Sequence, residues 1–380
     1  MKLEQRQWTS AEGWRVMGAS TLASAQAQVV LVFGGTAVLA DAVHLKEIQK
    51  RYPSAQLFGC STAGEICGTH VHDESLVTTA IRFEGTQVKG AQVKVASAAD
   101  SQRAGEELAQ AFDPHGLVHV FVLSDGLMIN GTELVHGLTR HLPPQVIVTG
   151  GLSGDGARFQ QTLVVCDGTA QSGRVAALGF YGTRLKVGHG SLGGWDAFGP
   201  ERLITRSRGN VLYQLDEMPA LGLYKKYLGK HAAGLPATGR LFPLSLRTTD
   251  QETGLVRTIL AVNEEEQSLT FAGDMPQGAH TRLMKANFDR LINGAVGAAK
   301  GSSHTLGSLS PQLAILISCV GRKLVLKQRV EEEVEGVREV LGDRTLLAGF
   351  YSYGEISPLT PQARCELHNQ TMTITVLAEV

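Results

Sequence analysis

Three short glycine-rich segments each carry an acidic residue directly after a glycine. The segments are GCSTAGEI, GGLSGDG and GFYSYGEI, and their acids are Glu65, Asp155 and Glu355. A carboxylate in such a turn could receive an ammonium group or hydrogen-bond the backbone of a shared ligand pocket. It could also accept hydrogen bonds from the backbone N–H groups of the following turn, which is the more common use of these residues. The residues alone leave both interpretations open.

The first segment also suggests two catalytic motifs, and neither is complete. Gly59–Gly64 has the glycine spacing of a phosphate-binding loop, but a glutamate follows where a lysine would neutralise phosphate. Cys60 and Ser61 lie where a nucleophile elbow presents its nucleophile, yet the last position of that motif is Ala63. No other residues complete a triad at a recognisable spacing. We therefore expect a binding protein and not an enzyme, with a Cys60 or Ser61 hydrolase as the less favoured alternative.

Among the twelve histidines, His189 has the surroundings best suited to a cofactor. It begins a glycine-rich segment that we expect to be an ordered loop, and Trp195 and Phe198 follow as a possible apolar wall. A neutral imidazole beside an aromatic surface suits the proximal side of a non-covalently bound haem iron. The alternative is a turn histidine that is bonded to the backbone. His70 and His72 lack an evident third ligand, which does not favour zinc.

The elements that must position these residues repeat along the chain. LFGCSTAGEI (Leu57–Ile66) aligns without gaps with LAGFYSYGEI (Leu347–Ile356), and a third, weaker copy covers Val118–Gly156. Each copy has the order strand, helix, strand, glycine turn with an acid, strand. Because such units need neighbours to bury their faces, we predict an α/β (α+β) fold in which duplicated units form mixed sheets in two halves.

The stretch between the copies has a different pattern. We expect a helix from Met218, strands within residues 240–275 and a helix over Gly278–Gly301, with a domain boundary near 205–220. A later helix should bury a stripe of valines from Val330 onward. Its acids Glu331–Glu333 and Glu335 should then face solvent.

Composition narrows the class of protein further. The chain has 380 residues, 43% of them hydrophobic, and its 35 basic residues are balanced by 36 acidic ones without a basic stripe, which argues against a nucleic-acid partner. The longest apolar run is less than half of the ~20 residues that a membrane span needs. The N-terminus lacks the features of a signal peptide, and the five widely spaced cysteines fit a reducing compartment. We expect a cytoplasmic protein with no membrane partner.

Several motifs together resemble a known family. GCSTAGEI near the start, and ISCVGRKLVL, GFYSYGEISP and LHNQTMT near the end, look like the FIST sensory domain. The resemblance covers the chain from about residue 25 to the end. It implies a FIST N-terminal domain over residues 25–215 and a FIST C-terminal domain over residues 216–380. FIST domains resemble intracellular sensors that are often fused to signalling modules and were proposed to bind small ligands such as amino acids.

The sequence carries no attached kinase, cyclase or receiver segment, so it is similar to the stand-alone bacterial members of the family that sense nitric oxide. That resemblance implies non-covalent haem b, nitric oxide as the diatomic ligand and a partner histidine kinase. His189 stands where many FIST domains carry a Gln-Gly-Cys-Arg-Pro-like stretch, which makes it the first expectation for the axial ligand. Trp195 and Phe198 would contact the haem. His368 is the second choice and His231 the third.

The alternative function is a signalling module that binds an amino acid or another metabolite without haem. Its ligand would contact residues of the three glycine-rich segments. The candidates are Cys60, Ser61, Glu65, Asp155, Tyr351, Tyr353 and Glu355.

Overall fold

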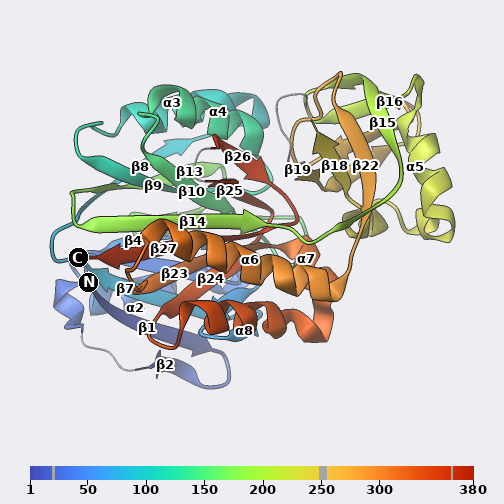
Figure 1. Ribbon diagram of the computed structural model, residues 1–380. Coiled ribbons are helices and arrows are strands. Elements are labelled where there is room, and N and C mark those ends of the chain that lie inside the picture. The colour runs from blue at the N-terminus through green and yellow to red at the C-terminus, as the bar shows by residue number, and fades with distance from the viewer. Residues whose placement is uncertain (19–21, 248–254, 361–362) are drawn as a thin grey trace.

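Three units with the same order of elements form the main body of the molecule (Figure 1). The structure is a computed structural model and describes residues 1–18, 22–247, 255–360 and 363–380. The first unit contains β3 (Val29–Gly34), α2 (Ala42–Arg51), β4 (Gln56–Ser61) and β7 (Leu76–Arg82). The second contains β9 (Leu117–Ser124), α4 (Gly131–His141), β10 (Ile147–Leu152) and β13 (Arg174–Tyr181). The third contains β23 (Leu313–Cys319), α8 (Val330–Leu341), β24 (Leu346–Ser352) and β27 (Met372–Glu379).

Within each unit the first strand lies in the middle of its sheet. β3 pairs in parallel with β4 and antiparallel with β7. In the same way, β9 pairs in parallel with β10 and antiparallel with β13, and β23 pairs in parallel with β24 and antiparallel with β27. Every residue of β3 and of β23 is buried, because strands in the middle of a sheet that is covered on both faces lose all contact with water. The apolar runs of the sequence are therefore the central strands.

The three sheets meet in one apolar core. Phe33 of the first unit lies against Phe350 of the third, with ring centroids 4.7 Å apart, and Phe58 lies 5.9 Å from Phe121 of the second unit. All four rings are buried in the same cluster. Each sheet thus contributes one face to the centre of the molecule.

A short strand from each unit pairs in the sheet of another unit. β5 (Glu65–Cys67) follows β4 but pairs with β24, and β11 (Val164–Cys166) follows β10 but pairs with β4. β25 (Gly354–Pro358) follows β24 and pairs with β10. These exchanges form a closed cycle, so each of the three sheets depends on residues from two units.

Each sheet also has a strand that precedes its unit in the chain. These strands are β1 (Lys2–Thr9), β8 (Gln87–Lys94) and β14 (Leu185–Leu192), and they pair with β7, β13 and β27. Two further helices, α3 (Ser101–Gln110) and α6 (Phe288–Leu306), pack against α4 and α8. The shorter elements of the three units are β2 (Gly13–Met17), α1 (Thr36–Ala40), β6 (His70–His72), β12 (Thr169–Gln171), α7 (Val320–Leu326) and β26 (Cys365–His368).

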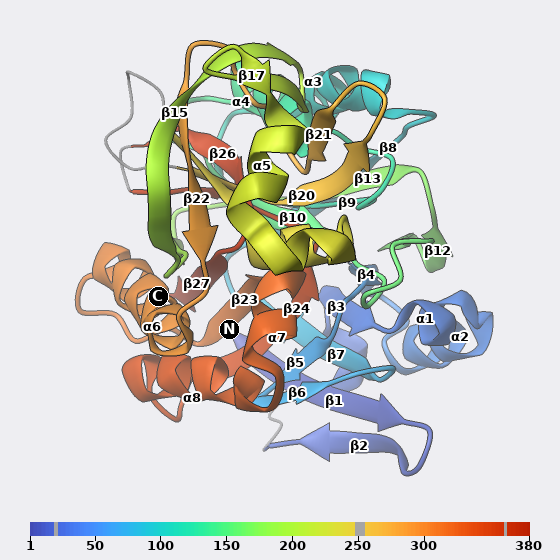
Figure 2. The ribbon, with the colours of Figure 1, turned by 90° about the vertical axis from the view of Figure 1, so that its right-hand side faces the viewer.

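A separate β-rich unit, the inserted unit, is formed by residues 196–285 between β14 and α6. It lies to one side of the three units in Figure 1 and faces the viewer in Figure 2. It has its own apolar core around Leu212, Tyr224 and Phe271. Its strands and helix are β15 (Asp196–Arg208), β16 (Val211–Leu215), β17 (Met218–Pro219), α5 (Ala220–Leu228), β18 (Leu244–Arg247), β19 (Leu255–Arg257), β20 (Ile259–Asn263), β21 (Ser268–Phe271) and β22 (His280–Lys285).

The α/β class with mixed sheets is confirmed, while two local predictions were wrong. The segment after residue 189 is not a loop, since His189 lies within β14 and residues 196–208 form β15. The helix expected over Gly278–Gly301 begins only at Phe288, because residues 280–285 form β22. No helix in the described ranges is both long and apolar enough to cross a membrane.

The glycines around His189 serve close packing and not a turn. A Cβ atom on Gly188 would lie 2.1 Å from the carbonyl oxygen of Ser302, and one on Gly190 would lie 2.2 Å from that of Ala298. Both carbonyls belong to α6, which lies directly on β14. Glycine in a strand marks such a close approach as readily as it marks a loop, which explains the wrong prediction.

The expectation that all the acids of α8 face solvent was also wrong. Glu333 is fully buried and forms an ion pair with Arg322, which is itself fully buried. The two side chains are joined by hydrogen bonds of 3.0 and 2.7 Å. Tyr351 donates to the other carboxylate oxygen of Glu333 at 2.6 Å. This network ties α7, α8 and β24 together inside the third unit.

Candidate functional site

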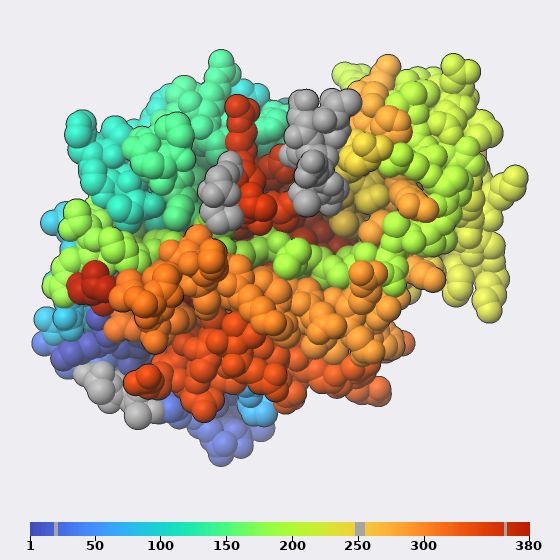
Figure 3. All heavy atoms as spheres, in the orientation of Figure 1, coloured from blue at the N-terminus to red at the C-terminus, as the bar shows by residue number. Residues whose placement is uncertain are grey.

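A cavity of about 900 Å³ lies beside β14 and contains His189 in its lining. We call it the His189 cavity. Its wall is formed by the end of α4, the chain up to β10, β14, one residue of α6 and the segment around β26. The lining residues used below are Arg140, Leu142, Val146, Val148, His189, Pro358, Arg364 and Glu366. Figure 3 shows this face of the molecule, where β14 forms a light-green band below a hollow that contains red residues near the C-terminus.

His189 is buried within β14, and its imidazole has one nitrogen without a hydrogen-bond partner among the described residues. His189 pairs with Thr375 of β27 across the sheet, and its side chain is only 4% exposed. Its Nδ1 is buried without a hydrogen-bond partner among the described residues. Burial lowers the pKa of the imidazole, and the nearby Pro358 backbone offsets part of this shift. A buried polar atom without a partner is rare enough to need an explanation, and a bound ligand is one.

The cavity combines an apolar body with basic residues. Leu142, Val146 and Val148 provide apolar surface, while Arg140 and Arg364 provide positive charge. Glu366 is the only acidic residue in the part of the lining that the structure describes. The volume lies within the range of about 300–1,000 Å³ that is usual for small-molecule sites.

These features fit haem b, the cofactor that the sequence resemblance implies. A neutral imidazole is a common axial ligand of haem iron, and His189 offers one in a buried position. Arginine forms strong paired hydrogen bonds with carboxylates such as the haem propionates. The apolar walls match the body of the porphyrin. The residues present therefore fit the group.

The other residues expected to contact haem lie elsewhere. Trp195 packs with Leu291 and Leu326, and its indole N–H donates to the Gln370 carbonyl at 3.0 Å. Phe198 lies beside Phe242 in the inserted unit, with ring centroids 6.2 Å apart. Neither residue is part of the described lining of the His189 cavity.

The second and third choices for an axial ligand are also outside this lining. The Nε2 atom of His368 lies 2.8 Å from the Ser357 carbonyl oxygen, and burial lowers the pKa of this imidazole to about 4. His231 is exposed, and its ring centroid lies 5.3 Å from that of Phe242. Of the three histidines, His189 alone lines the cavity in the described residues.

Glu65 and Glu355 have equivalent surroundings in the first and third units. Glu65 accepts hydrogen bonds from Thr62 and from both the backbone N–H and the hydroxyl of Ser75, the latter two at 3.0 and 2.7 Å. Glu355 accepts from Ser352 at 2.6 Å and from the backbone and hydroxyl of Thr371 at 3.2 and 3.0 Å. Burial raises the pKa of Glu65 to about 7 and that of Glu355 to about 8. Each acid thus joins its glycine turn to a later loop.

Asp155 of the second unit has different partners. It accepts hydrogen bonds from Arg158 at 2.8 Å and from the backbone of Gln161 at 3.2 Å. Burial alone would raise the pKa of Asp155, but these hydrogen bonds outweigh it and lower the pKa. The structure does not bring the three acids into one pocket, since each is engaged with its own loop.

The remaining candidates from the glycine-rich segments are divided between the core and another cavity. Cys60 is fully buried, and burial raises the pKa of its thiol. Ser61 donates to the Gly154 carbonyl and accepts from the Leu163 N–H, both at 2.8 Å. Tyr351 is buried against Glu333. Tyr353, in contrast, lines a cavity of about 300 Å³ next to the inserted unit.

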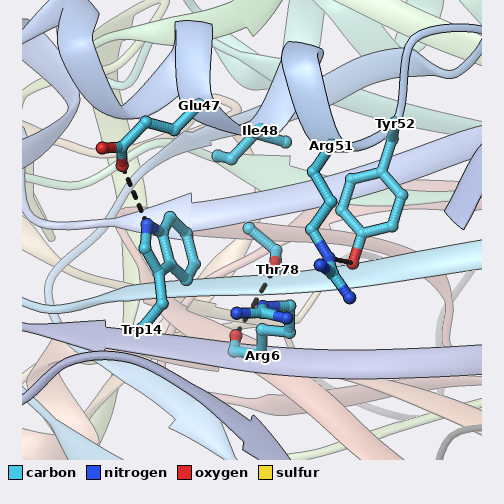
Figure 4. Close-up of a pocket in the computed structure, with 7 residues that line it drawn as sticks. All are labelled: Arg6, Trp14, Glu47, Ile48, Arg51, Tyr52 and Thr78. Carbon is cyan, nitrogen blue, oxygen red and sulfur yellow. Dashed lines mark hydrogen bonds between the residues drawn. The ribbon is translucent and has the colours of Figure 1, made fainter.

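A third and much smaller cavity lies between α2 and the β1–β2 hairpin (Figure 4). Its volume is about 80 Å³, far below the range of about 300–1,000 Å³ that is usual for small-molecule sites. Two residues that line this cavity are joined by a hydrogen bond, in which the indole N–H of Trp14 donates to the Glu47 carboxylate at 2.9 Å. This cavity is too small for a cofactor.

Sequence reasoning missed most of the residues that line the two larger cavities. Arg140, Arg364, Phe159 and Arg240 belong to segments without a recognisable motif. They are brought together by the pairing of β25 with β10 and by the position of the inserted unit. Among the residues that line these two cavities, His189 was indicated by its glycine-rich segment and Tyr353 by the repeated glycine segment.

Comparisons with known proteins give two matches that together cover most of the chain. A FIST N domain model matches residues 28–218, and a FIST C domain model matches residues 220–358. A protein of Methanocaldococcus jannaschii, described as uncharacterized protein MJ1623, is 22% identical over 316 residues. That match covers 76% of this chain and 59% of the relative, so the chain matches less than two thirds of the relative's length.

One of the solved structures that match this chain is a hydrolase. The cyanuric acid hydrolase of A. caulinodans is 8% identical, and the alignment covers 94% of this chain and 91% of the hydrolase. The TM-score is 0.37, which is too low to support an inference about fold or function.

Proposed function

Because this chain belongs to the FIST family, whose domains are signalling sensor domains, we propose that it binds haem b and senses nitric oxide for a partner histidine kinase. The observation that supports haem most directly is the imidazole of His189. It is buried, lines a cavity of about 900 Å³ and has an uncommitted Nδ1. The nitric oxide and kinase parts of the proposal rest on the sequence resemblance to the members of the family that sense nitric oxide.

In this proposal each part of the cavity has a separate task. His189 would be the axial ligand, and Arg140 and Arg364 would receive the propionates. Leu142, Val146 and Val148 would exclude water from the bound porphyrin. When bound, haem b would supply the iron that binds nitric oxide.

The position of His189 in a strand limits how a signal could leave the site. β14 is fixed by pairing with β27 on one edge and by close contact with α6 on its face. A change at the imidazole would therefore act on these two elements, and not on a freely moving loop. The burial of Cys60 and Ser61 supports a sensor without catalytic activity, since a nucleophile must reach its substrate.

A titration of the haem-free protein with haem b tests the proposal. We expect a saturable Soret band at one haem per chain, which His189→Ala should abolish or shift. Added imidazole should restore part of the signal in His189→Ala, because the substitution leaves room for a free ligand. His231→Ala is the matched control and should behave as the unchanged protein, since its ring is exposed and outside the cavity lining.

Two results would count against this assignment. An unchanged haem spectrum in His189→Ala would exclude His189 as the axial ligand. Non-saturating adsorption of haem by the unchanged protein would exclude a specific site altogether. Circular dichroism of each variant would confirm that the fold is kept.

A further inference from the structure

The cavity next to the inserted unit, which we call the Arg240 cavity, has a wall from three parts of the molecule. Its volume is about 300 Å³. Asn130 and Phe159 come from the second unit, Tyr353 comes from the third, and Arg240 and Phe271 come from the inserted unit. Arg240 belongs to a short 3₁₀ helix, Ala237–Leu241. Sites between domains are a preferred location for small ligands.

Three side chains form a stack along this wall. The guanidinium carbon of Arg240 lies 3.8 Å from the centre of the Phe159 ring. The rings of Phe159 and Tyr353 are 4.1 Å apart and nearly parallel, at 6°. The hydroxyl of Tyr353 accepts from the Phe159 N–H at 3.3 Å and donates to the Gly156 carbonyl at 3.2 Å. The stack is therefore anchored at one end by hydrogen bonds.

Phe159 adopts a backbone conformation that is unfavourable for a large side chain. Its φ is +55°, in the left-handed region that bulky residues rarely occupy. Such strain persists where the surrounding structure enforces it and is concentrated at functional sites. Here it directs an aromatic ring between Arg240 and Tyr353.

The positive charge of Arg240 is not neutralised within the described structure. Its Nε is buried and has no hydrogen-bond partner there, and no described carboxylate forms an ion pair with its guanidinium. Burial lowers the pKa of this guanidinium. A partly buried cation without a counter-charge is costly, and a bound anion would remove that cost.

We propose that the Arg240 cavity binds a small organic carboxylate with an apolar or aromatic body. Its carboxylate would pair with Arg240, and its body would lie against apolar side chains such as Leu152 and Phe271. No acidic residue is present in the described lining, and the Asp274 carboxylate behind Asn130 already accepts from the Asn130 amide at 2.9 Å, so an ammonium group on the ligand would have no direct counter-charge in the lining. This charge pattern favours a simple carboxylate over an amino acid.

The Arg240 cavity is distinct from the His189 cavity. The two have no described lining residue in common. They lie at opposite ends of α4, where Asn130 caps the first turn and Arg140 lies in the last. Because this site goes beyond the proposed haem function, either can fail without affecting the other.

Isothermal titration calorimetry on the haem-free full chain tests the proposal. The probes are benzoate, 3-phenylpropanoate and 3-methylbutanoate, together with L-phenylalanine, which adds an α-ammonium group to 3-phenylpropanoate. We expect saturable binding of at least one carboxylate at one per chain. L-phenylalanine should bind at least about tenfold more weakly than 3-phenylpropanoate, because the ammonium is desolvated without a partner.

Substitutions locate the binding. Arg240→Gln should weaken binding of the best carboxylate at least about tenfold, the loss expected for a charge-assisted hydrogen bond. Arg240→Lys should retain part of the affinity. Arg206→Gln is the matched control, since Arg206 is also in the inserted unit and lies over an aromatic ring, that of Tyr213, but is exposed and outside the cavity lining.

The proposal is overturned if none of the three carboxylates binds saturably to the unchanged protein. It is equally overturned if Arg240→Gln and Arg206→Gln bind the best carboxylate as the unchanged protein does. Thermal unfolding of each variant shows whether a loss of binding reflects a loss of fold, and Arg240→Lys then gives the deciding comparison. Haem titrations of the same variants should be unchanged, which separates this result from the haem proposal.

Discussion

Glu65 and Glu355 show how burial and hydrogen bonding combine at single residues. Both accept three hydrogen bonds from serine or threonine groups, yet the loss of water around them raises the pKa of both carboxyl groups. The same chemistry in two units shows that the repeated acid has a repeated structural role. Asp155 does not share this role, since its hydrogen bonds, including that from Arg158, lower the pKa of its carboxyl group.

The contribution of these two glutamates to the free energy of unfolding should therefore fall as pH rises from about 5 to about 8. An unfolded glutamate has a pKa of about 4.3, against about 7 and about 8 for Glu65 and Glu355 in the fold. A carboxyl group whose pKa is raised by folding stabilises the folded state at low pH. This stabilisation is complete below the pKa of the unfolded state and is lost as pH rises through the pKa of the folded state. The loss is at most about 1.4 kcal/mol per pH unit for each group. Relative to the unchanged protein, the free energy of unfolding of Glu355→Gln, measured in urea, should rise as pH increases over this range. Glu331→Gln should keep the original slope with pH, and equal slopes in both variants would refute the assignment.

The buried pair of Arg322 and Glu333 leads to a second prediction at this scale. Arg322→Met should destabilise the fold by about 3–5 kcal/mol, because it leaves the Glu333 carboxylate buried without its partner. Removing both charges, as in Arg322→Met with Glu333→Leu, should cost less than the single change. Denaturant unfolding is measured for four proteins: the unchanged protein, Arg322→Met, Glu333→Leu and the double variant. A double variant that is as unstable as the sum of both single variants would contradict the pairing.

At the scale of elements, the sequence predicted where the strands of the three units lie in the chain better than it predicted which strands pair with one another. Continuous apolar runs and repeated glycine turns indicated β3, β9 and β23 because both features are local. The pairing of β5, β11 and β25 with other units depends on distant contacts that a local pattern does not contain. His189 was recognised as a candidate, but the residues that complete its cavity come from remote segments.

Two errors at this scale have a physical explanation in the sequence itself. In the sequence, a glycine that allows a helix to pack closely against a strand looks the same as a glycine in a turn. The two can be distinguished only when the position of α6 on β14 is known. Glu333 lies three residues after Val330 and four before Val337, so helical spacing puts it on the buried stripe. Its charge alone suggested an exposed position, and its partner Arg322 could not be inferred from spacing.

The contact between α6 and β14 can be tested with a pair of glycine substitutions. Gly190→Ala should destabilise the protein by about 1–3 kcal/mol or more, because its Cβ would lie 2.2 Å from the Ala298 carbonyl oxygen. Gly301→Ala, on the facing side of α6, places its Cβ at an ordinary 3.8 Å from Gly190. It should be neutral or stabilising by up to about 1 kcal/mol, since alanine favours a helix. Equal losses in both variants in thermal unfolding would contradict this packing.

At the scale of the whole molecule, the exchanged strands make the three units one cooperative body. The third unit supplies β25 to the second and receives β5 from the first. The inserted unit, in contrast, leaves and rejoins the body at adjacent points, since Asp196 pairs with Lys285. Removing it would interrupt no strand exchange between the three units.

Shortened chains should show that the three units depend on one another for folding, while the inserted unit can be removed. A chain of residues 1–215 should lack a cooperative unfolding transition, because β5, β10 and β14 would lose their partners β24, β25 and β27. A chain in which residues 197–284 are replaced by a short glycine-serine linker should keep such a transition. Calorimetry of both measures the outcome. A sharp transition in the first fragment would show that the N-terminal part folds independently.

The central claim, that haem b is held by His189 and responds to nitric oxide, is tested most directly by one absorption measurement. The reconstituted and reduced protein is recorded before and after addition of nitric oxide, with His189→Ala recorded alongside. The account predicts one haem per chain and a Soret band that moves with nitric oxide in the unchanged protein, with a different starting spectrum in His189→Ala. Identical spectra for the two proteins, or haem uptake without saturation, would contradict it.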